Sequence, residues 1–103
     1  MYESKIKQIA DYYGLEEQLV QTAEECSELG KAALKLRRAL NDPLATDEDK
    51  LVARNNFIEE MADVLVMIEQ QCHLNGCETD VKNIVLAKVD RQIERIYERN
   101  AKA

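Results

Sequence analysis

The sequence has no tryptophan, and it contains only three glycines, one proline and five aromatic residues, which are four Tyr and one Phe. A β-sandwich or barrel needs many turns, and so few glycines and prolines supply too little turn chemistry for one. The remaining composition is dominated by Ala, Leu, Glu, Lys, Gln and Arg, the residues that favour helices. The composition therefore predicts an all-α protein.

An excess of basic residues is also missing, since 14 Lys and Arg face 20 Asp and Glu and give a formal net charge of −6. Nucleic-acid backbones are bound by clustered Lys and Arg, so this balance argues against a nucleic-acid polymer as partner. No apolar run approaches the roughly 20 residues of a membrane helix, and the opening MYESKIKQIADYYG lacks the apolar centre of a signal peptide. We expect a cytoplasmic protein without a membrane partner.

The cysteines Cys26, Cys72 and Cys77 are odd in number and contain no CxxC pair. This usage fits reduced thiols better than a disulfide framework. A zinc cluster of Cys72, His73 and Cys77 is the alternative, but structural zinc usually takes four ligands at tighter spacings. We expect two thiols and a surface histidine near a helix end.

Four segments have helical periodicity, and no linker is long enough to divide them, which predicts a single domain over residues 1–103. The first helix is expected at residues 4–13, with Ser4 as a possible cap. The second is expected at about residues 15–40, before Pro43 stops it.

Thr46, followed three residues later by Asp49, has the spacing of a capping box and predicts the start of a third helix. Gly76 supplies its C-terminal stop, and Thr79 with Asp80 can cap a fourth helix. The short turns around two long helices imply an antiparallel pair with the flanking helices packed beside it. The expected architecture is a four-helix bundle.

Acidic residues crowd the second helix, where EECSE places Glu24, Glu25 and Glu28 within five positions. Residues three or four apart share a helix face, so Glu28 can converge with Glu25 or with Glu24. Position favours Glu25, which lies between Thr22 and Leu29 at the edge of the helix's apolar stripe. That stripe consists of Leu15, Leu19, Thr22, Cys26, Leu29, Ala33, Leu36 and Leu40.

The third helix repeats this device with Glu60 and Asp63, three residues apart. Residues 61–68, MADVLVMI, project apolar groups in nearly every direction, and Asp63 is the one charge among them. A helix that is apolar all round is normally buried, and a buried carboxylate is costly unless something compensates it. We therefore expect Asp63 to be buried against a compensating group.

Four carboxylates can meet between the second and third helices: Glu25, Glu28, Glu60 and Asp63. Together they would raise one another's pKa, and a bound divalent cation would reverse that repulsion. Ligation by carboxylates alone selects hard cations such as Mg²⁺ or Mn²⁺. The alternatives are solvated glutamates, and for Asp63 a buried salt bridge to Arg37, Arg54 or Lys88.

The segments EECSE (24–28) and EMAD (60–63) match the EExxE and ExxD signature of the MazG-like, all-α nucleoside triphosphate pyrophosphohydrolases. The resemblance covers about residues 15–97 and is to the short, single-domain members. It implies hydrolysis of nucleoside triphosphates, often deoxy or damaged ones in a house-cleaning role, to the monophosphate and pyrophosphate.

The resemblance also implies the roles of individual residues. By this resemblance, Glu24 is a catalytic residue that lies behind the metal ligands or near the base of the nucleotide. The resemblance also implies assembly as a homodimer or homotetramer. The implied Mg²⁺ ligands, which also count as catalytic residues, are Glu25, Glu28, Glu60 and Asp63.

Cationic groups for the phosphates are expected on the last helix, where Lys88 and Arg91 are three residues apart and Arg95 follows four later. Lys31 and Lys35, which follow Glu28 on the second helix, are further candidates. The alternative is that the last-helix cations are solvated partners of Asp90, Glu94 and Glu98.

Three other functions compete with this interpretation. Phosphoribosyl-ATP pyrophosphohydrolase has a similar signature, but the apolar run and the VMIEQ segment look more like the nucleotide house-cleaning group. A di-iron carboxylate protein is disfavoured, because such bundles use ExxH pairs and the residue three before His73, the single histidine, is Gln70. A non-catalytic helical interaction module, whose acidic cluster binds a cation or a basic partner, is the third.

Overall fold

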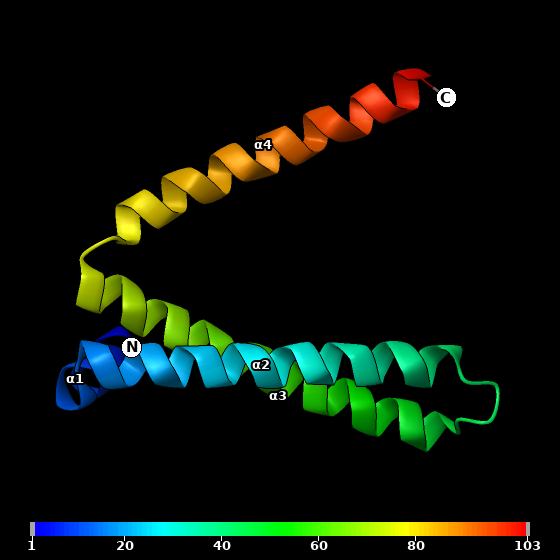
Figure 1. Ribbon diagram of the computed structural model, residues 1–103, viewed down its shortest axis with the longest axis horizontal. Helices are drawn as coiled ribbons and strands as arrows, with labels where there is room; N and C mark the ends of the chain where they lie inside the picture. The colour runs from blue at the N-terminus through cyan, green and yellow to red at the C-terminus, as the bar shows by residue number, and fades with distance from the viewer. Residues whose placement is uncertain (1, 103) are drawn as a thin grey trace.

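The computed structural model describes residues 2–102, which form four α-helices and no strand (Figure 1). This confirms the expected all-α fold class. No helix in this range is both long and apolar enough to cross a membrane. The helices are α1 (Glu3–Tyr13), α2 (Leu15–Asn41), α3 (Asp47–Asn75) and α4 (Glu78–Lys102).

The helices α2 and α3 form the expected antiparallel pair and lie side by side along most of their length (Figure 1). The turn between them is ordered by Asp42, whose Oδ1 accepts a 2.9 Å hydrogen bond from the Leu44 amide. The predicted capping box is present: Thr46 Oγ1 accepts from the Asp49 amide and Asp49 Oδ2 accepts from the Thr46 amide, both at 3.0 Å. These local bonds satisfy amides that the start of α3 would otherwise leave free.

Two of the expected caps are wrong. The helix α1 begins at Glu3, so Ser4 lies inside it, and its cap residue Tyr2 makes no side-chain capping bond. Likewise α4 begins at Glu78, which places Thr79 and Asp80 inside the first turn. Both helices start one or more residues earlier than a side-chain cap would require.

The core is small and runs along the contact of α1, α2 and α3. Its buried apolar residues are Ile6, Ala10, Ala32, Val64 and Met67. Gln18 and Gln70 are buried among them, and Gln18 Nε2 donates a hydrogen bond to Gln70 Oε1, so this polar pair is satisfied across the helix interface. A core of this size leaves much apolar surface exposed on a single chain.

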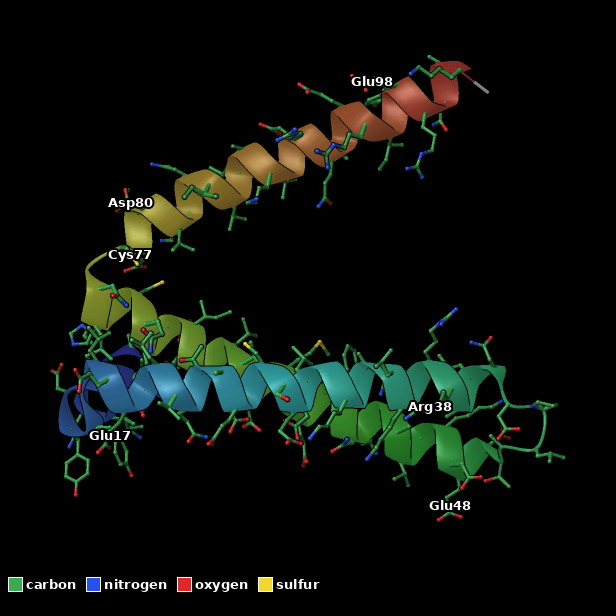
Figure 2. All side chains as sticks on the ribbon, in the orientation of Figure 1. Glu17, Arg38, Glu48, Cys77, Asp80 and Glu98 are labelled. Carbon is green, nitrogen blue, oxygen red and sulfur yellow. The ribbon has the colours of Figure 1, made fainter. Side chains whose placement is uncertain are left out.

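The helix α4 departs from the other three and contacts only α3 among the described helices (Figure 1). None of its residues is buried, and its side chains project from a helix with no neighbour along most of its length (Figure 2). The expectation that α4 packs beside the α2–α3 pair is therefore wrong for a single chain. The physical reason is that α4 contacts α3 only near the short turn at Gly76, after which its direction carries it away from α2 and α3 (Figure 1).

One face of α4 is apolar and open. Val85, Val89, Ile93 and Ile96, here called the α4 stripe, recur every three or four residues and are 50%, 53%, 48% and 54% exposed. Lys82 lies three residues before Val85 and therefore on the same face of α4, and it lines a cavity shared with α3. The stripe thus continues the face that α4 turns toward α3.

Candidate metal centre

Three carboxylates from the two signature segments meet between α2 and α3. Glu25, Glu60 and Asp63 each offer an oxygen, and these oxygens all lie within 4.8 Å of one another. Glu60 and Asp63 share a face of α3 because they are three residues apart, and Glu25 faces them because α2 is the antiparallel neighbour. Three carboxylate oxygens at this spacing are a donor set that suits a hard divalent cation.

On α2, the ambiguity between Glu24 and Glu25 is resolved by position. Glu25 is partly buried and belongs to the carboxylate group, whereas Glu24 is exposed and lies outside it. Gln21, one turn earlier, donates a 2.8 Å hydrogen bond from Nε2 to Glu25 Oε1. The sequence reasoning did not single out Gln21, although its spacing of four residues from Glu25 is a signal that could have found it.

Glu28 stands beside this group without joining it. Its side chain is 55% exposed and its Oε1 lies 3.4 Å from Nζ of Lys31, which is itself exposed. The pairing is local, because the two residues are three apart on one helix. The structure thus brings together three of the four expected ligands and places the fourth against a lysine.

The mutual repulsion of the carboxylates affects the pKa of Glu60. Loss of solvent raises the pKa of the Glu60 carboxyl, and the negative charges of Asp63, Glu25, Glu28 and Glu59 raise this pKa further. Glu28 is therefore close enough to act on the group even though it is turned toward Lys31. A site in which like charges raise a carboxyl pKa is one that a cation would stabilise.

Asp63 differs from its expected environment. It is exposed, and in the 61–68 run only Val64 and Met67 are buried, while Leu65 is 61% exposed. The prediction that this run is buried all round is therefore wrong for a single chain, because α2 covers only one side of α3 and α4 does not cover the other.

No arginine or lysine compensates Asp63 within residues 2–102. The ion pairs described there are Lys31–Glu28, His73–Asp11 and Lys82–Glu78. The salt-bridge alternative to a metal, with Arg37, Arg54 or Lys88 as the partner, is thus not present. The facing groups of Asp63 are other carboxylates.

The last-helix cations lie away from the carboxylates. Lys88, Arg91 and Arg95 are exposed on α4, which makes no contact with α2 in the described chain. They are not paired with Asp90, Glu94 or Glu98 either, since none of the ion pairs above includes these residues. A single chain therefore presents its carboxylates and these cations on separate surfaces.

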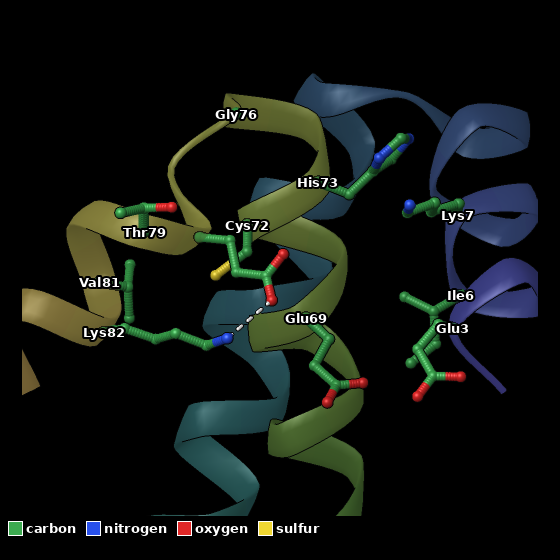
Figure 3. A pocket seen from close by; sticks show the side chains of 11 residues that line it. Glu3, Ile6, Lys7, Glu69, Cys72, His73, Gly76, Thr79, Val81 and Lys82 are labelled. Atoms are coloured by element: carbon green, nitrogen blue, oxygen red, sulfur yellow. Dashed lines mark ion pairs between the residues drawn. The ribbon is translucent and has the colours of Figure 1, made fainter. Parts of the chain in front are cut away.

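A cavity lies near the C-terminal end of α3, between α1, α3 and the start of α4 (Figure 3). Its volume is about 510 Å³, and it shares no residue with the carboxylate group. Beside it, His73 Nε2 lies 2.7 Å from Asp11 Oδ1 and ties α3 to α1. Cys72, His73 and Cys77 do not form a metal-binding group among the described residues, so the zinc alternative has no geometric support.

Comparison of the chain with protein-family models, with curated proteins and with solved structures gives no match. The carboxylate geometry and the two signature segments are therefore the features of this chain that point to a function.

Proposed function

We propose that this protein is a Mg²⁺-dependent nucleoside triphosphate pyrophosphohydrolase of the MazG-like kind, acting on deoxynucleotides or non-standard nucleotides. One observation carries the proposal: Glu25 from EExxE and Glu60 and Asp63 from ExxD offer oxygens within 4.8 Å of one another, from two different helices. An acidic segment on one helix is common, whereas here two such segments from different helices supply neighbouring oxygens.

Glu25, Glu60 and Asp63 would hold the ion, with Mn²⁺ as a possible substitute. When bound, Mg²⁺ neutralises charge on the phosphate oxygens and lowers the pKa of a bound water. Gln21 fixes the Glu25 carboxylate through its 2.8 Å hydrogen bond. Glu28, whose charge acts on Glu60, would become the fourth ligand on leaving Lys31, which would free the Lys31 ammonium for a phosphate.

We further propose that the protein works as a homodimer or homotetramer. The support is the α4 stripe, whose four apolar side chains are about half exposed, on a helix that contacts only α3 within residues 2–102. Within one chain, the α4 cations Lys88, Arg91 and Arg95 do not reach the carboxylate group. If a second copy covered the stripe, these cations would approach the carboxylate group of that copy.

The test is release of pyrophosphate from a panel of common, oxidised and deaminated nucleoside triphosphates, with and without Mg²⁺. We expect Mg²⁺-dependent release from at least one deoxynucleotide. Glu25→Gln should abolish it, whereas Glu17→Gln, a matched change in the exposed first turn of α2, should leave it unchanged.

The same panel separates the competing functions. Turnover of phosphoribosyl-ATP, with no turnover of any nucleoside triphosphate, would favour a phosphoribosyl-ATP pyrophosphohydrolase. Inactivity on every compound with Mg²⁺ bound would favour a non-catalytic helical module, for which the separation of the α4 cations from the carboxylates is the supporting observation.

A further inference from the structure

The turn between α3 and α4 has a backbone geometry that brings two cysteines together. Gly76 adopts φ 58° and ψ 37°, the left-handed conformation that ends a helix readily. Its amide donates to the His73 carbonyl at 3.3 Å, and the Cys77 amide donates to the Cys72 carbonyl at 3.1 Å. This pair of bonds defines a Schellman motif, in which the residues at the positions of Cys72 and Cys77 commonly have their side chains in contact.

The backbone bond from Cys77 to Cys72 makes the two cysteines neighbours across the turn, and the nearby Cys77 contributes to the raised pKa of the Cys72 thiol. Both residues are partly exposed and neither is in a disulfide. A disulfide requires Cα atoms about 4.4–6.8 Å apart, and a direct backbone hydrogen bond between the two residues is compatible with that spacing. The third cysteine, Cys26, lies on α2, beside the carboxylate group rather than at this turn.

We propose that Cys72 and Cys77 are a redox-modification site, a dithiol that closes to an intramolecular disulfide across the α3–α4 turn. The proposal goes beyond the hydrolase function and does not depend on it. The oxidant that it requires is a small-molecule disulfide such as oxidised glutathione.

The reaction balances as two thiol–disulfide exchanges. The Cys77 thiolate attacks one sulfur of oxidised glutathione, whose S–S bond breaks and releases a first glutathione. Cys72 then loses its proton to solvent and attacks Cys77 Sγ, forming the protein disulfide and releasing a second glutathione. Two cysteine thiols are oxidised by two electrons, and one glutathione disulfide is reduced to two thiols.

The order of attack follows from the surroundings of Cys72. Burial raises the pKa of the Cys72 thiol, and the neighbouring Cys77, Glu78 and Glu69 raise it further. Only a thiolate attacks a disulfide, so the raised pKa of the Cys72 thiol argues against a first attack by Cys72 and places it in the second step.

The site is placed where it can affect the rest of the molecule. Within residues 2–102, the helix α4 is attached to the other helices only through this turn and its contacts with α3 (Figure 1). In the cavity beside it, Cys72 of α3 lies close to Val81 and Lys82 of α4 (Figure 3). A covalent link across the turn would therefore restrict the direction in which α4, with its apolar stripe, leaves α3.

The experiment treats the reduced full-length chain with oxidised glutathione and counts free thiols with a thiol-reactive dye. We expect the number to fall from three to one, with an intact mass lower by two hydrogen atoms, and to return to three with dithiothreitol. Peptide mapping should link Cys72 to Cys77.

Three single variants, Cys26→Ser, Cys72→Ser and Cys77→Ser, serve as controls, each checked for helix content by circular dichroism. Cys26→Ser should fall from two thiols to none with the same mass loss. Cys72→Ser and Cys77→Ser should retain both thiols or form a mixed adduct with glutathione. Three thiols surviving in the wild type, a link that includes Cys26, or chains joined to one another would overturn the proposal.

Discussion

Replacing Val89 by Asp tests whether the α4 stripe is an interface between copies of this chain. Full burial of a Val or Ile side chain stabilises by about 1.5–3 kcal/mol. The four stripe residues are 48–54% exposed, so covering the remaining half gives about 0.7–1.5 kcal/mol each, or about 3–6 kcal/mol for one α4. That stabilisation is sufficient to contribute substantially to a stable dimer.

A dimer contains two copies of Val89, so the variant loses about 2 kcal/mol of apolar burial and adds two carboxylates to an apolar contact. A combined loss of at least about 3 kcal/mol would raise the dissociation constant of the dimer by at least about a hundredfold. The isolated chain should fold as before, because Val89 is exposed and α4 touches only α3.

Size-exclusion chromatography with light scattering measures the change, and circular dichroism confirms that the helices persist. Asn83→Asp adds the same charge to α4 outside the stripe and should leave the assembly intact. A wild-type protein that remains monomeric at high concentration, or a Val89→Asp protein that assembles as the wild type does, would refute the reasoning.

The remaining predictions concern stability. Since the pKa of Glu60 is raised above its ordinary 4.5 in the folded chain, its contribution favours folding at acid pH and is lost as pH rises through the raised value. Without Mg²⁺, Glu60→Gln should therefore melt higher than the wild type at neutral pH, and the gap should vanish in melts below the ordinary pKa. Mg²⁺ at ten times its dissociation constant should add about 1.4 kcal/mol and raise the melting temperature by about 6–11 °C. Scanning calorimetry should show no such shift in Asp63→Asn. Thr46→Ala, which removes the capping box, should cost about 0.5–2 kcal/mol in urea unfolding, and no loss would contradict the role of that cap.

Local signals predicted most of the helices correctly. The capping box at Thr46 and the stop at Gly76 act over a few residues, so the sequence contains all the information that they need. The cap predictions at Ser4 and Thr79 were wrong because a short polar side chain near a helix start is compatible with several starting points. Such signals indicate that a helix exists more reliably than they fix its first residue.

The packing of α4 could not be predicted in the same way. The apolar periodicity of α4 predicts that one face of the helix packs against another surface. The same pattern fits packing against a helix of the same chain or against another chain. The prediction that Asp63 is buried was wrong for the same reason, since an apolar run does not specify which helix covers it, and no second helix covers this side of α3 in the described chain.

Part of the carboxylate group was predictable and part was not. Helix periodicity and the antiparallel α2–α3 pair were enough to bring Glu25, Glu60 and Asp63 together. The turn of Glu28 toward Lys31 depends on side-chain rotamers, which the spacing of residues does not determine.

Pyrophosphate release from the preferred nucleotide, measured for wild-type, Asp63→Asn and Glu17→Gln proteins across a range of Mg²⁺ concentrations, tests the central claim most directly. The carboxylate group predicts Mg²⁺-dependent release in the wild type and in Glu17→Gln, and a loss of at least about a hundredfold in a folded Asp63→Asn protein. Equal release by Asp63→Asn and the wild type, at the same Mg²⁺ dependence, would contradict it.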